Sequence, residues 1–266
     1  MQGKPNPDAI LWQHLSSLPY FRGMLRAVEH SFYTELDLPQ PILDLGAGDG
    51  HFASLVFSDP VDVGLDPWRE PLQEARTRNS YHLLIQANGA QIPFPDGSFA
   101  TVISNSVLEH IPDLDPVLRE VQRVLQPGGR FVFCVPNHRF LTDLWGQTIL
   151  KKLGLHKLAA TYNRFFNRIA RHHHLDPYEI WQKRLESAGL IVENFWHYFP
   201  VEAMHILERG HLFGLPNLLW KKLFGRWVLF PHRVNPFIPH HHLRKLMNVG
   251  SCDDGTCTFY IARRSS

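Results

Sequence analysis

The fold of this chain is decided by the stretch Ile42-Leu43-Asp44-Leu45-Gly46-Ala47-Gly48-Asp49-Gly50-His51-Phe52-Ala53. A short apolar run leads into a glycine-rich turn and then into residues that suit a helix. Glycine lets the backbone turn tightly and approach a ligand closely, where a Cβ atom would collide. The order strand, glycine turn, helix is typical of the first unit of a nucleotide-binding α/β fold.

The spacing of the glycines indicates which ligand this turn suits. Gly46, Gly48 and Gly50 form G-x-G-x-G rather than the G-x-G-x-x-G of dinucleotide-binding folds. Asp44 stands before the first glycine, where a carboxylate suits a cationic ligand better than a pyrophosphate. The stretch resembles the first motif of class I S-adenosylmethionine (SAM)-dependent methyltransferases, and with it Ala47 is predicted to bind the cofactor. A flavin or nicotinamide site and a purely structural turn are the alternatives.

A second acidic residue supports the same ligand. The apolar run 61–65 predicts a second strand that ends at Asp66, about twenty residues beyond Gly46. Dinucleotide-binding folds place the carboxylate that binds the ribose hydroxyls at this spacing. Asp66 is therefore predicted to bind the ribose, with Pro67 beside it.

The resemblance continues after a third strand predicted at 81–86. Residues 88–99 read N-G-A-Q-I-P-F-P-D-G-S-F and resemble the D-A-x-x-L-P-F-P-D-x-S-F-D stretch of the large methyltransferase family that includes quinone-biosynthesis enzymes. In that family the first acid binds the adenine amino group. Asn88 stands at its place here, and its amide oxygen can still accept that bond, with Gly89 and Ala90 alongside. Ala100 replaces the closing acid.

The segment 101–113 resembles the fourth strand of the family and the loop after it. Because the carboxyl ends of parallel strands line the ligand crevice, Ser104, Asn105 and Ser106 are predicted to face the methionine part or the reacting methyl. His110 is a candidate general base, since its unperturbed pKa of about 6.5 suits proton removal near neutrality. The alternative is that His110 only orients the loop.

The resemblance is dense over residues 41–137 and thinner beyond. Residues 172–190 resemble the family's H-x-x-x-x-x-x-E-x-x-x-x-L-E-x-A-G-F helix before the sixth strand. His174 and Tyr162 join His110 as candidates for steering or deprotonating the acceptor. No metal site is predicted, because the three consecutive histidines 172–174 cannot all point at one ion and no further ligand spacing completes a site.

The charge is uneven along the chain. Residues 1–138 hold 9 Lys and Arg against 16 Asp and Glu, whereas residues 139–250 hold 16 against 7. The segment 212–230 is rich in Trp, Phe and Leu beside Lys221, Lys222 and Arg226, and a helix from Asn217 would suit a membrane interface. A hydrophobic wall over a lipophilic substrate, a plain buried helix and a nucleic-acid contact are the alternatives.

The sequence thus predicts an α/β fold with a Rossmann-like, seven-stranded, doubly wound sheet of the class I methyltransferase type. The expected parts are an N-terminal helical cover over 1–40, in which Asp8 caps a first helix, a SAM-binding domain over 41–199 plus 251–266, and a helical insertion over 200–250 before the last strand.

The resemblance implies methyl transfer from SAM, with S-adenosylhomocysteine as product, to a small or lipid-like acceptor. An RNA or protein methyltransferase and a SAM-binding protein without transfer are the alternatives. The absence of a signal peptide, of a membrane-spanning run and of a cysteine framework favours a cytoplasmic protein, with peripheral contact at the inner membrane surface as a further expectation.

Overall fold

The computed structural model of the chain describes residues 6–213, 215–228, 243–244 and 251–265, with only the backbone described at 212, 213 and 215–218. The chain divides into two compact units. The sheet unit consists of Asp37–Arg139, Asn167–Trp196 and Cys257–Ser266. The helical unit consists of Met1–Leu36, Phe140–Phe166 and His197–Thr256.

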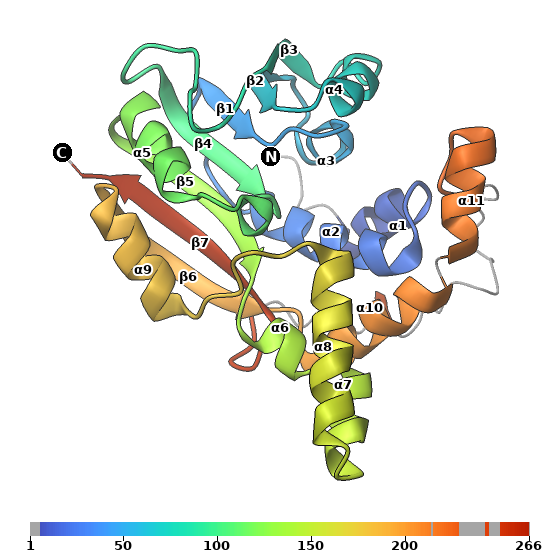
Figure 1. Cartoon of the computed structure of the whole chain (residues 1–266). Coiled ribbons are helices and arrows are strands. Elements are labelled where there is room, and N and C mark those ends of the chain that lie inside the picture. Colours follow the sequence, from blue (N-terminus) through green and yellow to red (C-terminus); the bar gives the residue numbers. More distant parts are fainter. Residues whose placement is uncertain (1–5, 214, 229–242, 245–250, 266) are drawn as a thin grey trace. The chain divides into compact units, whose positions relative to one another are not determined.

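Seven strands form one sheet in the order β3-β2-β1-β4-β5-β7-β6 (Figure 1). They are β1 Ile42–Leu45, β2 Val61–Asp66, β3 Tyr81–Gln86, β4 Phe99–Asn105, β5 Leu125–Pro136, β6 Leu190–Tyr198 and β7 Cys257–Arg264. Strands β1 to β5 pair in parallel, and β7 runs antiparallel to β5. The predicted seven-stranded α/β fold is confirmed.

Helices connect the strands and fill the helical unit. They are α1 Pro7–Leu15, α2 Tyr20–Tyr33, α3 His51–Val56, α4 Arg69–Arg76, the 3-10 turn η1 Leu108–His110, α5 Asp115–Val124, α6 Arg139–Thr142, α7 Trp145–Lys152, α8 His156–Ala170, α9 Tyr178–Ser187, α10 Val201–Phe213 and α11 Leu215–Phe224. None of the helices in the described part of the chain is long and apolar enough to cross a bilayer.

One hydrophobic core of the sheet unit packs on a single face of the strands. Every second residue of β1, β2 and β5 points to it, as in Leu43 and Leu45 on β1, because side chains alternate along a strand. Helices α5 and α9 cover this face with apolar side chains, among them Trp181. The ring of Phe133 stacks on Tyr260 with centroids 4.7 Å apart, so β5 and β7 are tied together beneath α9.

The helical unit contains buried polar groups that pair with one another. His14 Nε2 and His30 Nδ1 lie 3.1 Å apart and join α1 to α2. The Tyr198 hydroxyl donates to the buried Glu29 carboxylate at 2.9 Å. Such pairing lowers the cost of burying these groups.

Several local predictions need correction. The first helix is capped by Asn6, whose side chain accepts from the N–H of Asp8, and not by Asp8 itself. The helix expected to start at Asn217 begins at Leu215 and ends at Phe224. Residues 214, 229 and 230 of the predicted basic aromatic segment 212–230 lie outside the described residues.

The predicted domain limits stay a prediction. The compact units group Phe140–Phe166 with the N-terminal helices and His197–Thr256, whereas the predicted limits keep it with the sheet. In both divisions, the residues predicted to bind the cofactor lie together, in the unit that contains the sheet.

Candidate active site

The glycine turn after β1 is held by the neighbouring strand β2. The N–H groups of Gly46 and Ala47 both donate to the carbonyl of Leu65, at 2.8 and 3.0 Å. Gly46, Gly48 and Gly50 have φ angles of +84°, +55° and +68°, in the left-handed region that glycine adopts without strain. The turn therefore needs glycine at all three positions.

The glycines differ in what surrounds them. A Cβ atom on Gly46 would lie 2.5 Å from Val107 Cγ1, and one on Gly50 would lie 3.0 Å from Ser80 Oγ. A Cβ atom on Gly48 would meet, within 4 Å and among the described residues, only the Gly46 carbonyl oxygen at 3.9 Å. The turn is thus packed against protein at two glycines and is open at Gly48, where a ligand can approach the backbone.

Asp66 ends β2 beside this open glycine. Its Oδ2 accepts the N–H of Gly48 at 3.0 Å, and its Oδ1 accepts the N–H of Trp68 at 2.8 Å. Burial raises the pKa of the Asp66 carboxyl, and the two N–H groups oppose that rise. A carboxylate has about four acceptor positions, so both oxygens are fixed in place and keep capacity for ribose hydroxyls.

Backbone carbonyls at Asp66 and Pro67 hold the end of β2 against the end of β3. The carbonyl of Pro67 accepts from the Gln86 side chain at 3.1 Å, and the carbonyl of Asp66 accepts the N–H of Ala87 at 3.2 Å. The ends of β2 and β3 are thereby linked. The Trp68 side chain is 71% exposed.

Asp44 has a partner that the sequence does not reveal. The Tyr81 hydroxyl donates to Asp44 Oδ2 at 2.6 Å, and the Asp44 side chain is buried. Burial, and then the charge and the hydrogen bond of Asp44, raise the pKa of Tyr81 well above its usual value. Tyr81 therefore stays protonated and anchors the carboxylate that precedes the glycine turn.

Asn88 lies in the loop after β3, where its side chain closes a turn. Its Oδ1 accepts the N–H of Ala90 at 2.9 Å, and the side chain is exposed. The predicted bond from the adenine amino group would thus use the second lone pair of the same oxygen. Gly89 is buried, and a Cβ atom there would lie 3.0 Å from Leu45.

The end of β4 separates three residues that the sequence grouped together. The Ser104 side chain is fully buried and donates to the Leu45 carbonyl at 2.9 Å, so its hydroxyl faces the backbone of β1, and its predicted contact with the ligand stays a prediction. Asn105 Oδ1 accepts from the Cys134 thiol at 3.0 Å. Ser106 has φ +53° and is half-buried.

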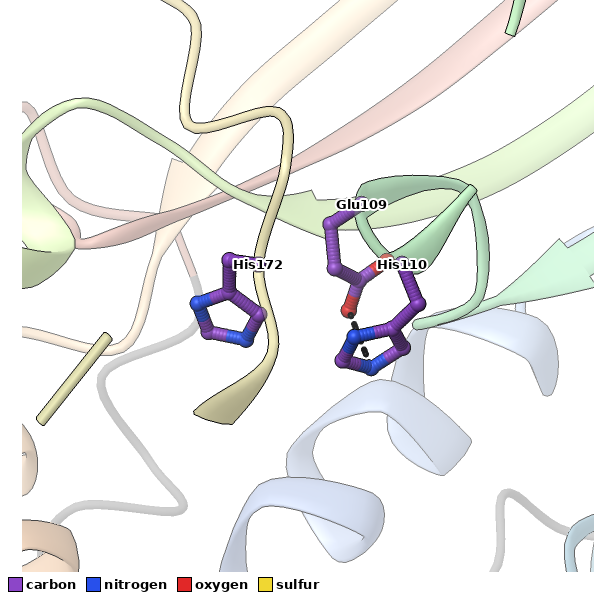
Figure 2. A group of neighbouring side chains, drawn as sticks. All are labelled: Glu109, His110 and His172. Atoms are coloured by element: carbon purple, nitrogen blue, oxygen red, sulfur yellow. Dashed lines mark ion pairs between the residues drawn. The ribbon is translucent and has the colours of Figure 1, made fainter. Parts of the chain in front are cut away.

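His110 lies at the loop after β4 beside two other ligand-type residues. Its Nδ1 lies 3.1 Å from the carbonyl oxygen of Arg171. Since a carbonyl only accepts, Nδ1 carries a proton, and in the neutral ring Nε2 carries the lone pair. Figure 2 shows the Glu109 carboxylate next to this ring, with Oε1 3.7 Å from Nε2, and the ring of His172 to one side, its centroid 5.2 Å from that of the His110 ring.

The His174 ring contacts two partners that the sequence does not reveal. Its Nε2 donates to the Ile111 carbonyl at 2.9 Å, and its Nδ1 accepts from Arg184 at 3.0 Å. Both ring nitrogens are therefore engaged in holding the segment before α9 against the loop after β4. Its predicted role in steering or deprotonating the acceptor stays a prediction, and these two contacts give the ring a structural role as well.

Tyr162 is also engaged elsewhere. It lies in the helical unit, where its hydroxyl donates to Glu208 Oε1. The same carboxylate accepts the N–H groups of Trp145 and Gly146. Burial and Glu208 raise the pKa of Tyr162, which makes it a poor base, so the structure gives it a structural role.

Arg123 is a further residue that pattern reasoning missed. It donates to Glu120, to Asp96 and to the carbonyls of Phe94 and Ile92, at 2.7 to 2.9 Å. This network fixes the loop over 92–96 that follows the predicted adenine segment. An Arg three positions after a Glu on a predicted helix was the only local signal, and such pairs are common on helices.

Comparison with known proteins agrees with this geometry. The family model described as "Methyltransferase domain" matches residues 43–133. The chain is 30% identical over 182 residues to the ubiquinone/menaquinone biosynthesis C-methyltransferase UbiE of Hahella chejuensis, a match that covers 62% of this chain and 72% of that protein.

Two solved structures share the fold. A SAM-dependent methyltransferase of Thermotoga maritima is 14% identical with a TM-score of 0.55, and the match covers 98% of this chain and 100% of that one. Geranyl diphosphate C-methyltransferase of Streptomyces coelicolor, solved with Mg²⁺, geranyl diphosphate and S-adenosylhomocysteine, is 15% identical with a TM-score of 0.55 over 92% of this chain and 82% of that one. This chain belongs to the family of SAM-dependent methyltransferases that includes the ubiquinone/menaquinone biosynthesis enzymes.

Proposed function

We propose that the chain binds SAM at the carboxyl ends of β1, β2 and β3 and transfers its methyl group to a small, lipid-like acceptor. The observation that carries the proposal is the Asp66 carboxylate, which two backbone N–H groups fix beside the open turn at Gly48. Asp66 would accept the ribose hydroxyls, and the loop over 88–90 would contact the adenine. Asp44 would attract the cationic methionine end.

When bound, SAM supplies a methyl group on a positively charged sulfur. The residues of the chain would hold the acceptor in line with that methyl, and positioning of this kind accounts for a large part of the rate in two-substrate reactions. The acceptor gains the methyl and loses a proton, while the sulfur keeps the bonding electrons. Of the three predicted catalytic side chains, the proposal favours His110, and it is supported by the contact of Nδ1 with the Arg171 carbonyl, which puts the basic nitrogen of the neutral ring at Nε2.

The lipid-like acceptor is supported by the name of the relative, a quinone-biosynthesis enzyme. It is also supported by exposed apolar side chains around α7 and α8, namely Trp145, Leu153, Leu155, Leu158 and Phe165. Exposed cations accompany them at Lys151, Lys152, Lys157 and Arg164. This mixture suits an anionic bilayer surface, and α11 adds exposed Leu219, Leu223 and Phe224. We therefore propose peripheral contact with the inner membrane surface through α7–α8 as well as through 212–230.

Calorimetric titration with SAM, S-adenosylhomocysteine and NAD tests the cofactor. We expect micromolar binding of the first two and none of NAD. Asp66→Ala should weaken binding at least tenfold, whereas Asp59→Ala, at an exposed acid before β2, should leave it unchanged. A thermal melt confirms that each variant is folded at the titration temperature. No binding of SAM by the wild type, or full affinity in Asp66→Ala, would refute the proposed site.

Vesicle sedimentation tests whether the protein binds to a lipid surface. Vesicles with anionic lipid should retain the protein, and neutral vesicles should retain less. Leu158→Glu combined with Phe165→Glu should lower retention, whereas Thr161→Glu, on the same helix at an exposed polar position, should lower it less. Binding to RNA with a steep salt dependence, and none to vesicles, would favour a nucleic-acid substrate instead.

A further inference from the structure

Glu109, His110 and His172 come together from two segments that are distant in the sequence. Glu109 and His110 lie in η1, after β4, and His172 lies between α8 and α9. One ligand-type atom from each residue lies within 4.8 Å of the others. In Figure 2 the Glu109 carboxylate and the two imidazole rings lie close together.

Backbone hydrogen bonds fix this juxtaposition on both sides of His172. The Glu109 carbonyl accepts the N–H groups of His173 and His174, at 2.7 and 3.3 Å. The Arg171 carbonyl accepts from His110 Nδ1 at 3.1 Å. The segment 171–174 is therefore tied to η1 immediately before and immediately after His172.

The donor set favours a transition metal over Mg²⁺ or Ca²⁺. Two imidazoles and one carboxylate suit Zn²⁺ and its neighbours, whereas the alkaline-earth ions prefer oxygen ligands alone. Metal-bound histidines usually donate their other ring N–H to a carbonyl or carboxylate. His110 already does so through Nδ1, and its Nε2 lies 3.7 Å from Glu109 Oε1.

Burial makes the cluster asymmetric. The side chain of Glu109 is 3% exposed, and that of His110 is 43% exposed. Three protein ligands with one accessible side are typical of catalytic zinc sites, which keep a coordination position for water or substrate. Two atoms that bind a tetrahedral zinc at about 2.1 Å lie about 3.4 Å apart, so ligand atoms that now lie within 4.8 Å of one another must approach by up to about 1.4 Å through side-chain rotation.

The cluster adjoins the proposed cofactor turn. Val107, two residues before Glu109, contacts the glycine turn so closely that a Cβ atom on Gly46 would lie 2.5 Å from its Cγ1. Strands β1 and β4 are also paired neighbours, with Asp44 opposite Ile103. An ion at the cluster would therefore lie at the same edge of the sheet as the proposed methyl donor.

We propose that Glu109, His110 and His172 bind one zinc-type divalent ion, whose open position takes an oxygen of the methyl acceptor. The ion-binding part stands on the cluster itself, and the acceptor part rests on the proposed function. The prediction of no metal site rested on the triplet 172–174 and on the lack of a further ligand at a suitable spacing in the sequence. The structure brings only His172 of that triplet to the cluster and supplies the other two ligands from η1.

The test uses the metal-depleted full chain, titrated with Co²⁺ by absorption spectroscopy and with Zn²⁺ by calorimetry. We expect one strongly bound equivalent with the visible bands of Co²⁺ bound by protein ligands. His172→Ala and His110→Ala should each weaken binding at least tenfold. His173→Ala is the matched control, because this neighbouring histidine is exposed and outside the cluster, and it should bind as the wild type does.

Wild-type affinity in His172→Ala would overturn the proposal, because the ion would then lie at other histidines. Absence of any strong Co²⁺ or Zn²⁺ binding would also overturn it. SAM titration of the metal-depleted protein separates this outcome from failure of the proposed function, since SAM binding through Asp66 does not require the ion. Catechol added to the Co²⁺-loaded wild type tests whether the open position accepts oxygen donors. We expect it to shift the visible bands of the bound Co²⁺.

Discussion

Replacing Tyr81 with Phe tests whether the hydroxyl of Tyr81 supports the glycine turn through Asp44. The change removes one donor, at 2.6 Å from a buried carboxylate, and leaves the ring in place. A hydrogen bond to a charged group contributes about 1.5–3 kcal/mol, so unfolding should become easier by about that amount. For a chain of 266 residues this lowers the melting temperature by about 3–5 °C.

The same variant should also weaken SAM binding. Asp44 directly precedes the glycine turn, and without its donor the carboxylate is no longer fixed. We expect a loss of about fivefold to tenfold in affinity, about 1–1.4 kcal/mol. Tyr198→Phe is the control, since it removes a hydroxyl bond of 2.9 Å to the buried Glu29 but involves none of the predicted cofactor residues. It should destabilise the protein and leave SAM affinity unchanged.

The pH dependence of the difference between wild type and Tyr81→Phe gives a second readout. Burial and Asp44 hold the folded-state pKa of Tyr81 well above 10. The contribution of Tyr81 is therefore fully present below pH of about 10 and is lost as the pH rises further. Urea unfolding at pH 7, 9 and 10.5 measures it. Equal stability of the two proteins at pH 7, or an equal loss of SAM affinity in Tyr198→Phe, would refute the reasoning.

Three further variants test the remaining networks. Arg123→Lys removes the forked contacts to the loop over 92–96 and should destabilise the protein by about 1–3 kcal/mol. Limited proteolysis should show greater cleavage in that loop, and unchanged cleavage would contradict the prediction. Glu208→Gln weakens the acceptor shared by Tyr162 and two backbone N–H groups. It should lower the free energy of unfolding by about 1–3 kcal/mol and the melting temperature by a few degrees, without changing the SAM affinity. Burial lowers the pKa of His30 to about 4, so the unfolded chain binds the proton more readily, and stability should fall by about 3 kcal/mol as the pH drops from 6.5 to 4. Urea unfolding of His30→Asn should show a flatter profile over this range, and an equally steep one would contradict the assignment.

Much of the proposed cofactor site follows from local sequence. Gly46, Gly48 and Gly50 occupy left-handed backbone conformations, and such requirements are expressed within a few residues of the turn. Asp66 lies at the end of its strand because the apolar run before it defines where the strand ends. Local patterns of this kind predict both the elements and their order.

The contacts that sequence reasoning missed join distant segments of the chain. Ser104 is internal because the register of β4 against β1 brings its hydroxyl to the Leu45 carbonyl. Tyr162 and His174 carry the right functional groups for catalysis, but their partners Glu208 and Arg184 lie on other helices. A chemical type alone does not say which partner engages it.

The sequence by itself determined the family, the seven-stranded α/β fold, the glycine turn and the acid that follows the second strand. These features depend on backbone conformation and on alternation within single elements, both of which are encoded locally. Only the tertiary structure decided that Tyr81 anchors Asp44 and that His172 lies beside Glu109 and His110. Those contacts join segments that are far apart along the chain, and they form because strand pairing and backbone hydrogen bonds bring the segments together.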